Sequence, residues 1–254
     1  MSASDPFPFP KETQMAAPAD TAPAPSNNAG DSPSTGSAPA KDALTPLKPK
    51  MRGWLHAGWT PIAVAAGIVL LVLAHDTAGR VGAAVFLAGS LMLFGTSAVY
   101  HRGTWSPKAN AVLRRMDHSN IFVFIAATYT PMALTLLEGS SRVTLLSIAW
   151  GAAILGLGFR IGWLGAPRWL YTILYLAMGW VALGWLPTFW RTGGPAIFFL
   201  ILGGGLLYSI GAVVYARKFP NPSPKWFGFH EIFHACTIGA FACHYTAIAM
   251  ATLR

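Results

Sequence analysis

The stretch WLHAGWTPIAVAAGIVLLVLA, from Trp54 to Ala74, contains no Asp, Glu, Lys or Arg. About 20 apolar residues are enough to cross the hydrocarbon core of a bilayer as a helix, so this stretch predicts a transmembrane helix. Polar or Pro/Gly-rich positions divide the chain beyond it into six further apolar stretches of similar length. They run over residues 81–100, 117–137, 143–163, 170–189, 195–215 and 227–250. The sequence therefore predicts an all-α integral membrane protein, with a seven-transmembrane helix bundle over residues 51–254.

The composition of the chain agrees with a membrane protein. Only 11% of the 254 residues are charged, whereas soluble domains carry about a quarter. The net charge of +9 comes from basic residues in short loops and not from one basic stripe. We therefore read these residues as topology signals and expect no nucleic-acid partner. Cys236 and Cys243 lie about two helical turns apart in one apolar stretch, so we expect no disulfide between them.

Residues 1–50 have a different composition. They hold ten of the nineteen prolines and few large aliphatic residues. Such a segment buries too little apolar surface to offset the entropy of ordering it, so we expect a disordered N-terminal tail. The tail lacks a basic start followed by an apolar stretch, and we expect the protein to insert without a cleaved signal peptide.

Basic residues beside the span ends predict the orientation in the membrane. Those on the side of the N-terminus number thirteen: Lys41, Lys48, Lys50, Arg52, Arg102, Lys108, Arg114, Arg115, Arg160, Arg168, Arg217, Lys218 and Lys225. Those on the other side number four: Arg80, Arg142, Arg191 and Arg254. Because short loops rich in Lys and Arg stay in the cytoplasm, we expect a cytoplasmic N-terminus and an external C-terminus.

Five polar residues are expected to converge in the cytoplasmic half of the bundle. Ser97 and His101 end the second stretch, Asp117 begins the third, and His230 and His234 lie near the start of the seventh. Residues four apart share one face of a helix. Ionisable residues within a membrane are costly unless they find partners in the bundle interior. Three imidazoles with an open fourth position are the ligand pattern of a catalytic zinc.

Other interpretations of these histidines stay open. A transmembrane histidine can serve as a hydrogen-bond partner between helices, and the cluster would then be structural. A haem would need two facing histidines at matched depth, such as His101 and His234. His244 lies about 15 Å further along the seventh helix than His234, too far to share that metal.

Three further polar residues have predicted surroundings. We expect His118 to face a headgroup or loop, because it points about 100° away from Asp117. His56 either lines the interior beside the site or lies at the interface. Glu231 is expected to interact with the helix dipole or with an arginine.

Three segments of this chain resemble the hemolysin III branch of the progestin and adipoQ receptor family. They are Ser97-Ala-Val-Tyr-His101, Arg115-Met-Asp117-His-Ser-Asn and Phe229-His230-Glu-Ile-Phe-His234. The resemblance covers residues 51–254 and implies a multi-pass protein of the bacterial plasma membrane. The family's first-helix motif is not kept, since Pro49 and Arg52 replace its Glu and Asn. The role of His56 and the substrate therefore stay open.

The same resemblance implies an intramembrane zinc site. Zinc would be bound by His101, His230 and His234, Asp117 would hold the zinc-bound water, and Ser97 would hydrogen-bond nearby. Two functions follow from it. One is a ceramidase-like hydrolase of a lipid amide or ester, and the other is a membrane-perturbing or signalling protein with a structural zinc. The partners would be the lipid bilayer and a lipid substrate, while the oligomeric state is not predicted.

The orientation can be tested by labelling whole cells with a membrane-impermeant thiol reagent. Ser37→Cys and a cysteine appended after Arg254 would be introduced separately, with Cys236 and Cys243 replaced by serine. We expect labelling of the appended cysteine only, because thirteen basic residues hold the opposite ends of the spans in the cytoplasm. Labelling of the tail and not of the terminus would reverse the orientation.

Overall fold

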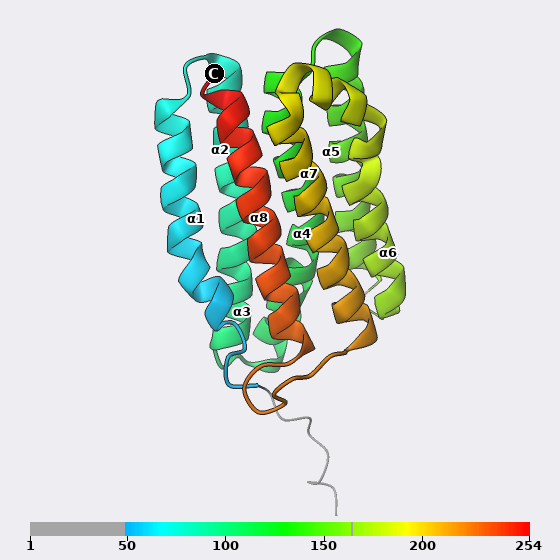
Figure 1. Ribbon diagram of the computed structural model, residues 1–254. Helices are drawn as coiled ribbons and strands as arrows, with labels where there is room; N and C mark the ends of the chain where they lie inside the picture. Colours follow the sequence, from blue (N-terminus) through cyan, green and yellow to red (C-terminus); the bar gives the residue numbers. More distant parts are fainter. Residues whose placement is uncertain (1–48, 164) are drawn as a thin grey trace, which may run out of the picture. The chain divides into compact units, whose positions relative to one another are not determined.

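The computed structural model describes residues 49–163 and 165–254, which are helical apart from loops and one isolated bridge between Ser223 and Phe227. The expected tail, residues 1–50, lies outside the described residues except for its last two positions. Figure 1 shows the helices lying side by side as a bundle. In order they are α1 (Trp54–Leu73), α2 (Thr77–Ser90), the π-helical η1 (Leu91–Gly95), α3 (Thr96–Arg102), α4 (Pro107–Leu136), α5 (Gly139–Gly162), α6 (Arg168–Gly179), the 3₁₀-helical η2 (Trp180–Trp185), α7 (Leu186–Arg217) and α8 (Phe229–Thr252).

Six helical segments among the described residues are long and apolar enough to cross a membrane. One of them, Arg168–Arg217, has 50 residues, or about 75 Å of helix, more than twice the thickness of a bilayer core. It is broken at Gly194, where φ is 78° and ψ is 174°, and Figure 1 shows the chain turning back between α6 and the long part of α7. This segment therefore makes two passes and the other five make one each, which agrees with the predicted seven.

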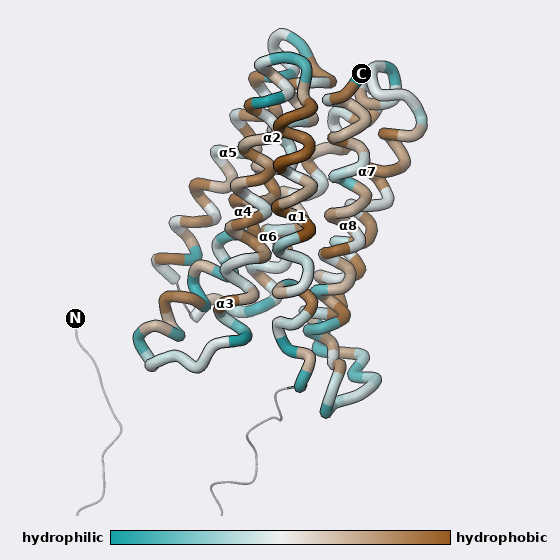
Figure 2. Tube along the Cα trace, turned by 90° about the vertical axis from the view of Figure 1, so that its left-hand side faces the viewer, coloured by the Kyte–Doolittle hydropathy of each residue, from teal (hydrophilic) through white to brown (hydrophobic). Residues whose placement is uncertain are grey.

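The two ends of the bundle are more hydrophilic than its middle. Figure 2 shows hydrophobic residues along the helices and hydrophilic residues gathered in the connections between them. The first described residues and the C-terminus lie at opposite ends of the bundle (Figure 1). An odd number of passes requires this arrangement.

The third pass begins earlier than predicted. α4 starts at Pro107 instead of Asp117, because Ser106 caps the helix through the backbone N–H of Ala109 and proline is favoured in the first turn. Arg114 and Arg115 therefore lie on a helix that extends beyond the apolar region. The loop between the second and third passes is correspondingly shorter.

A tyrosine of α4 satisfies the backbone where the fifth pass departs from α-helical geometry. The Tyr129 hydroxyl lies 3.1 Å from the carbonyl oxygen of Met178 and accepts from the backbone N–H of Ala182 at 3.0 Å. Backbone groups freed inside a membrane need such a partner, since no water is available there. Tyr129 thereby ties the centre of the bundle to the junction of α6 and η2.

Small residues let α5 approach α4 closely. A Cβ atom added at Gly156 would lie 2.5 Å from the Phe122 ring, which is itself 2% exposed. A Cβ atom added at Gly158 or Gly162 would meet nothing within 4 Å. Of these three glycines, only Gly156 is required by the packing that the structure describes.

The packing of α5 on α4 predicts opposite effects of two similar substitutions. Gly156→Ala should lower stability by ~1–3 kcal/mol, because the new methyl group overpacks a buried ring. Gly158→Ala should leave stability unchanged or slightly higher, because alanine favours the helix and the site is open. Thermal unfolding of the detergent-purified proteins compares them, and equal midpoints would contradict this packing.

Candidate metal centre

Three histidines from two helices meet at one end of the bundle. His101 ends α3, while His230 and His234 lie in the first two turns of α8, and all three are buried. Their ligand nitrogens all lie within 4.8 Å of one another, and Nε2 of His101 is 3.2 Å from Nε2 of His230. Two nitrogens bound to one tetrahedral zinc would be about 3.3 Å apart, given bonds of about 2.0 Å. The three side chains are thus placed to hold a metal ion.

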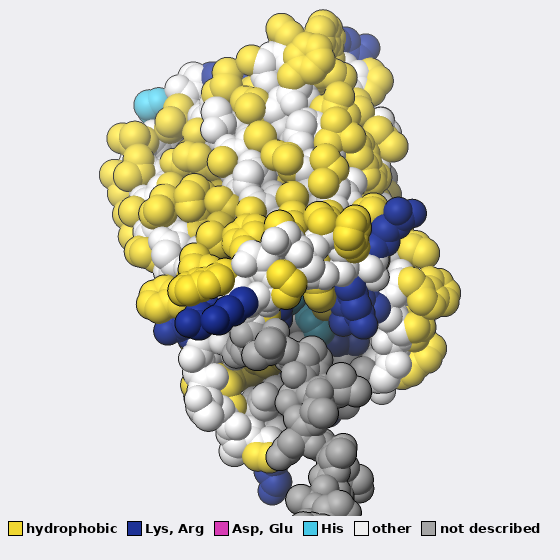
Figure 3. Space-filling model, turned by 60° about the horizontal axis from the view of Figure 1, so that its bottom comes forward, with side chains coloured by type: hydrophobic (Ala, Val, Ile, Leu, Met, Phe, Trp, Pro, Cys, Tyr) yellow, Lys and Arg dark blue, Asp and Glu magenta, His cyan; other side chains and the backbone are white. Residues whose placement is uncertain are grey.

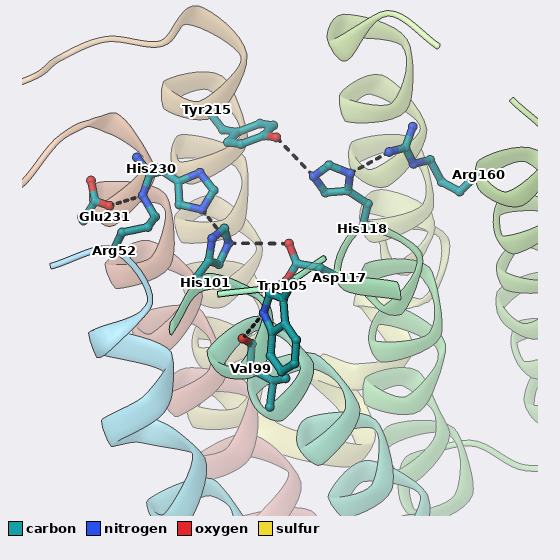
Figure 4. A network of polar contacts seen from close by, with 10 residues as sticks. All are labelled: Arg52, Val99, His101, Trp105, Asp117, His118, Arg160, Tyr215, His230 and Glu231. Atoms are coloured by element: carbon teal, nitrogen blue, oxygen red, sulfur yellow. Dashed lines mark hydrogen bonds and ion pairs between the residues drawn. The ribbon is translucent and has the colours of Figure 1, made fainter. Parts of the chain in front are cut away.

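Asp117 and Ser97 lie beside the three histidines. Asp117 Oδ2 is 3.7 Å from Nε2 of His101, and Figure 4 shows the carboxylate pointing from α4 toward that ring. The Ser97 hydroxyl is buried and close enough to interact with Asp117, although its geometry falls short of a hydrogen bond. The structure therefore brings together all five residues that the sequence singles out.

The π-helical segment η1 determines which way His101 points. A π-turn inserts one residue into a helix and so rotates everything after it by about 100°. The backbone carbonyl of Met92 in this segment accepts a hydrogen bond from Asn120 Nδ2 at 2.8 Å, and the same amide donates to Thr96 Oγ1 at 3.0 Å. Asn120 of α4 thereby holds the irregular turn that aims Ser97 and His101 at the site.

His56 of α1 belongs to the same cluster. Its ring is 3% exposed and stacks on His234, with the ring centroids 3.7 Å apart and the planes inclined by 14°. Neither ring nitrogen of His56 has a hydrogen-bond partner among the described residues. Of the two surroundings expected for His56, the structure thus shows the interior one, and stacking fixes the ring plane of His234.

A buried ion pair holds the start of α8. Glu231 accepts from Arg52 Nε at 2.5 Å (Figure 4). It also accepts from the backbone N–H of Gly228 at 2.8 Å. This confirms the predicted pairing of Glu231 with an arginine. The chain before α1 is also tied to the loop before α8, because the backbone N–H of Lys50 donates to the carbonyl of Lys225. These contacts position His230 and His234 against α1.

His118 does not face a headgroup or loop, and that prediction was wrong. Figure 4 shows its ring between Arg160 of α5 and Tyr215 of α7. Arg160 Nη2 donates to His118 Nδ1 at 2.6 Å, which leaves Nε2 of His118 to carry its proton toward Tyr215. The partners come from distant parts of the chain, so the spacing around Asp117 carries no signal for them.

A cavity adjoins the cluster and extends between α4, α6, α7 and α8, with lining residues from Asp117 to Met132 along α4. At one end it is lined by His56, Ser97, Asp117, His118, His230 and His234, and most of its remaining wall is apolar. Figure 3 shows Lys and Arg side chains around a recess at this end of the bundle, with a histidine inside it. The cavity thus has a polar end beside the three histidines that could bind a metal ion, and an apolar chamber that continues from it.

Comparison with known proteins gives one consistent family. The family model described as haemolysin-III related matches residues 44–245. The chain is 33% identical over 165 residues to the hemolysin-3 homolog of Bacillus subtilis (strain 168), which covers 65% of this chain and 74% of that protein. It is 32% identical over 184 residues to hemolysin-3 of Bacillus cereus, and the aligned region covers 71% of this chain and 81% of that protein. Because the family match spans most of the chain, the chain belongs to the haemolysin-III-related family, a branch of the progestin and adipoQ receptor family.

Proposed function

We propose that this protein is an intramembrane zinc-dependent hydrolase that cleaves an amide or ester bond of a lipid. The observation that carries the proposal is that His230, His234, Asp117 and Ser97 line one cavity. A structural zinc is closed by four protein ligands, whereas a catalytic zinc keeps a position open for water or substrate. Three histidines beside a cavity fit the ligand pattern of a catalytic zinc site.

The form of the cavity supports a lipid as the substrate. Its apolar wall, which includes Ile125, Met132, Leu183 and Ile201, suits an acyl chain, and its polar end suits a carbonyl group. A chain lying in this chamber would bring its head to the histidine cluster. The placement of the polar end beside a long apolar space thus supports a lipid as the proposed substrate class.

The residues around the cluster have distinct chemical roles in this proposal. Zinc held by His101, His230 and His234 would supply a Lewis acid that polarises the carbonyl and acidifies water. Asp117 Oδ2 acts as general base: it takes a proton from the water that bonds to the carbonyl carbon. The proton then passes to the leaving nitrogen or oxygen as its bond to that carbon breaks. The Ser97 hydroxyl orients the water or donates to the developing oxyanion.

We also propose that the cluster lies at the cytoplasmic end of the bundle in a bacterial plasma membrane. The basic residues around the recess in Figure 3 support this, because positively charged ends stay in the cytoplasm. Substrate head and water would then reach the cluster from inside the cell.

The names of the relatives suggest a second function, perturbation of membranes with a purely structural zinc. An amphipathic segment that is free to insert would favour lysis. In the part of the chain that the structure describes, every helix belongs to one of the membrane-spanning segments. This favours the hydrolase over lysis, and a signalling protein with a structural zinc is separated from it by the activity test below.

Metal content tests the ligand assignment. We expect about one zinc per chain in the purified protein, and its loss in His101→Ala, His230→Ala and His234→Ala, since a three-histidine site has no spare ligand. His75→Ala is the matched control, because His75 is exposed and lies outside the cluster. Elemental analysis measures all five proteins, and equal zinc throughout would exclude these ligands.

A second prediction separates metal binding from chemistry. Asp117→Asn should keep most of the zinc, because the three imidazoles remain, but should lose ~10² to 10⁴-fold of the hydrolytic rate. Ser97→Ala should lose about 10² to 10³-fold if its hydroxyl donates to the oxyanion. Release of free fatty acid from a panel of lipid amides and esters is followed by mass spectrometry.

The wild type provides the decisive control in that assay. An unchanged rate in Asp117→Asn would contradict the role of this carboxylate. Zinc-loaded wild type that releases no fatty acid from any lipid would favour a structural zinc. The three histidine variants should then lower only thermal stability.

A further inference from the structure

Two polar atoms at the deep end of the cavity have no partner within residues 49–163 and 165–254. They are the hydroxyl oxygen of Tyr208 in α7 and Nδ1 of His244 in α8, and both are buried. Both residues line the cavity, and their ring centroids are 5.5 Å apart. A polar group without a hydrogen bond is costly inside a membrane protein, so this pair calls for a specific explanation.

The neighbouring polar side chains along the same wall are satisfied. Ser209 Oγ donates to the carbonyl of Gly205 and accepts from Trp180 Nε1. Thr237 Oγ1 donates to the carbonyl of Phe233 at 2.9 Å. Apart from His56, His234 and Ser97 at the histidine cluster, the described cavity-lining residues with unpaired buried side-chain atoms are Tyr208 and His244.

The hydrogen-bonding character of His244 follows from its contacts. Nε2 lies 3.1 Å from the carbonyl oxygen of Ile201, which only accepts, so Nε2 carries the proton and Nδ1 is an acceptor. A Cβ atom added at Gly204 would lie 2.3 Å from Cδ2 of His244. The imidazole ring thus packs closely against α7, and this packing holds its acceptor atom, Nδ1, in one position.

We propose that Tyr208 and His244 bind a hydroxyl group carried partway along the acyl chain of the lipid in this cavity. Nδ1 of His244 needs a donor, and the Tyr208 hydroxyl can donate to an acceptor. A single hydroxyl group both donates and accepts, whereas a keto group only accepts and an ammonium only donates. The inference rests on the lipid substrate proposed above and narrows it to hydroxylated chains.

The position of the pair sets where the hydroxyl must lie. His244 is ten residues beyond His234 on the same helix, which corresponds to about 15 Å along the axis. A lipid with its carbonyl at the histidine cluster would reach this depth about two-thirds of the way along an extended octadecanoyl chain, the position called mid-chain below. A hydroxyl group next to the carbonyl would stay at the cluster end and miss the pair.

The test compares binding of octadecanoic acid with that of isomers whose added hydroxyl lies beside the carboxyl group, at mid-chain or at the chain end. Dissociation constants come from displacement of radiolabelled octadecanoic acid from detergent-purified, full-length protein. We expect the mid-chain isomer to bind roughly 3- to 30-fold more tightly than the parent, the gain of one or two neutral hydrogen bonds. The other isomers should show no such gain.

Two matched variants assign that gain to its residues. Tyr208→Phe removes only the hydroxyl oxygen and should abolish the preference for the mid-chain isomer. Tyr245→Phe is the control, because its hydroxyl donates to the carbonyl of Ala66 and Tyr245 is not among the residues that line the cavity. This variant should keep the preference. His244→Leu removes the acceptor nitrogen and repeats the test from the other side.

The possible failures are distinguishable. Equal affinities for parent and isomers in the wild type would overturn the hydroxyl site, because the pair then holds only water, while leaving a lipid-binding cavity. A preference that survives in both Tyr208→Phe and His244→Leu would also overturn it. The binding test does not depend on hydrolysis. A protein that shows the preference but releases no fatty acid in the hydrolysis assay would contradict the proposed catalysis and support the hydroxyl site.

Discussion

The buried carboxylate of Glu231 is the group on which the geometry of the metal-competent end depends. One oxygen accepts from Arg52, which precedes α1, and the other accepts from the backbone at the start of α8. The same residue therefore fixes where α8 begins and where α1 enters the bundle. The start of α8 sets the positions of His230 and His234. The entry of α1 sets the position of His56, which stacks on His234. Removing one partner of a buried ion pair costs ~3–5 kcal/mol, because the other charge is left unpaired.

The fold could be predicted from the sequence largely because a bilayer allows few solutions. Long apolar stretches have to be helices, and basic residues mark their ends. The start of α4 was misplaced because Lys108, Arg114 and Arg115 resemble a loop while they lie on a helix that continues past the apolar region. Apolarity reports where lipid lies, but capping by Ser106 decides where the helix begins.

The site was predictable where its residues share a helix and less so where they do not. The four-residue spacing placed Ser97 with His101 and His230 with His234, and helix direction brought Asp117 to them. His118 was misread because Arg160, 42 positions away, decides its surroundings. The stacking of His56 on His234 likewise joins the first helix to the last. The roles of these residues in catalysis remain predictions, since geometry alone does not report a reaction.

The π-turn at η1 separates two properties of the second pass that usually change together. Losing one residue between Leu91 and Gly95 would leave an apolar helix of almost unchanged length, which would insert into the membrane as before. Ser97 and His101 would nevertheless turn by about 100° and leave the cluster. A deletion here would therefore leave the membrane topology unchanged but would remove Ser97 and His101 from the cluster. Among relatives, the residue count of this span, and not its hydropathy, is the feature that should track whether the histidine cluster is kept.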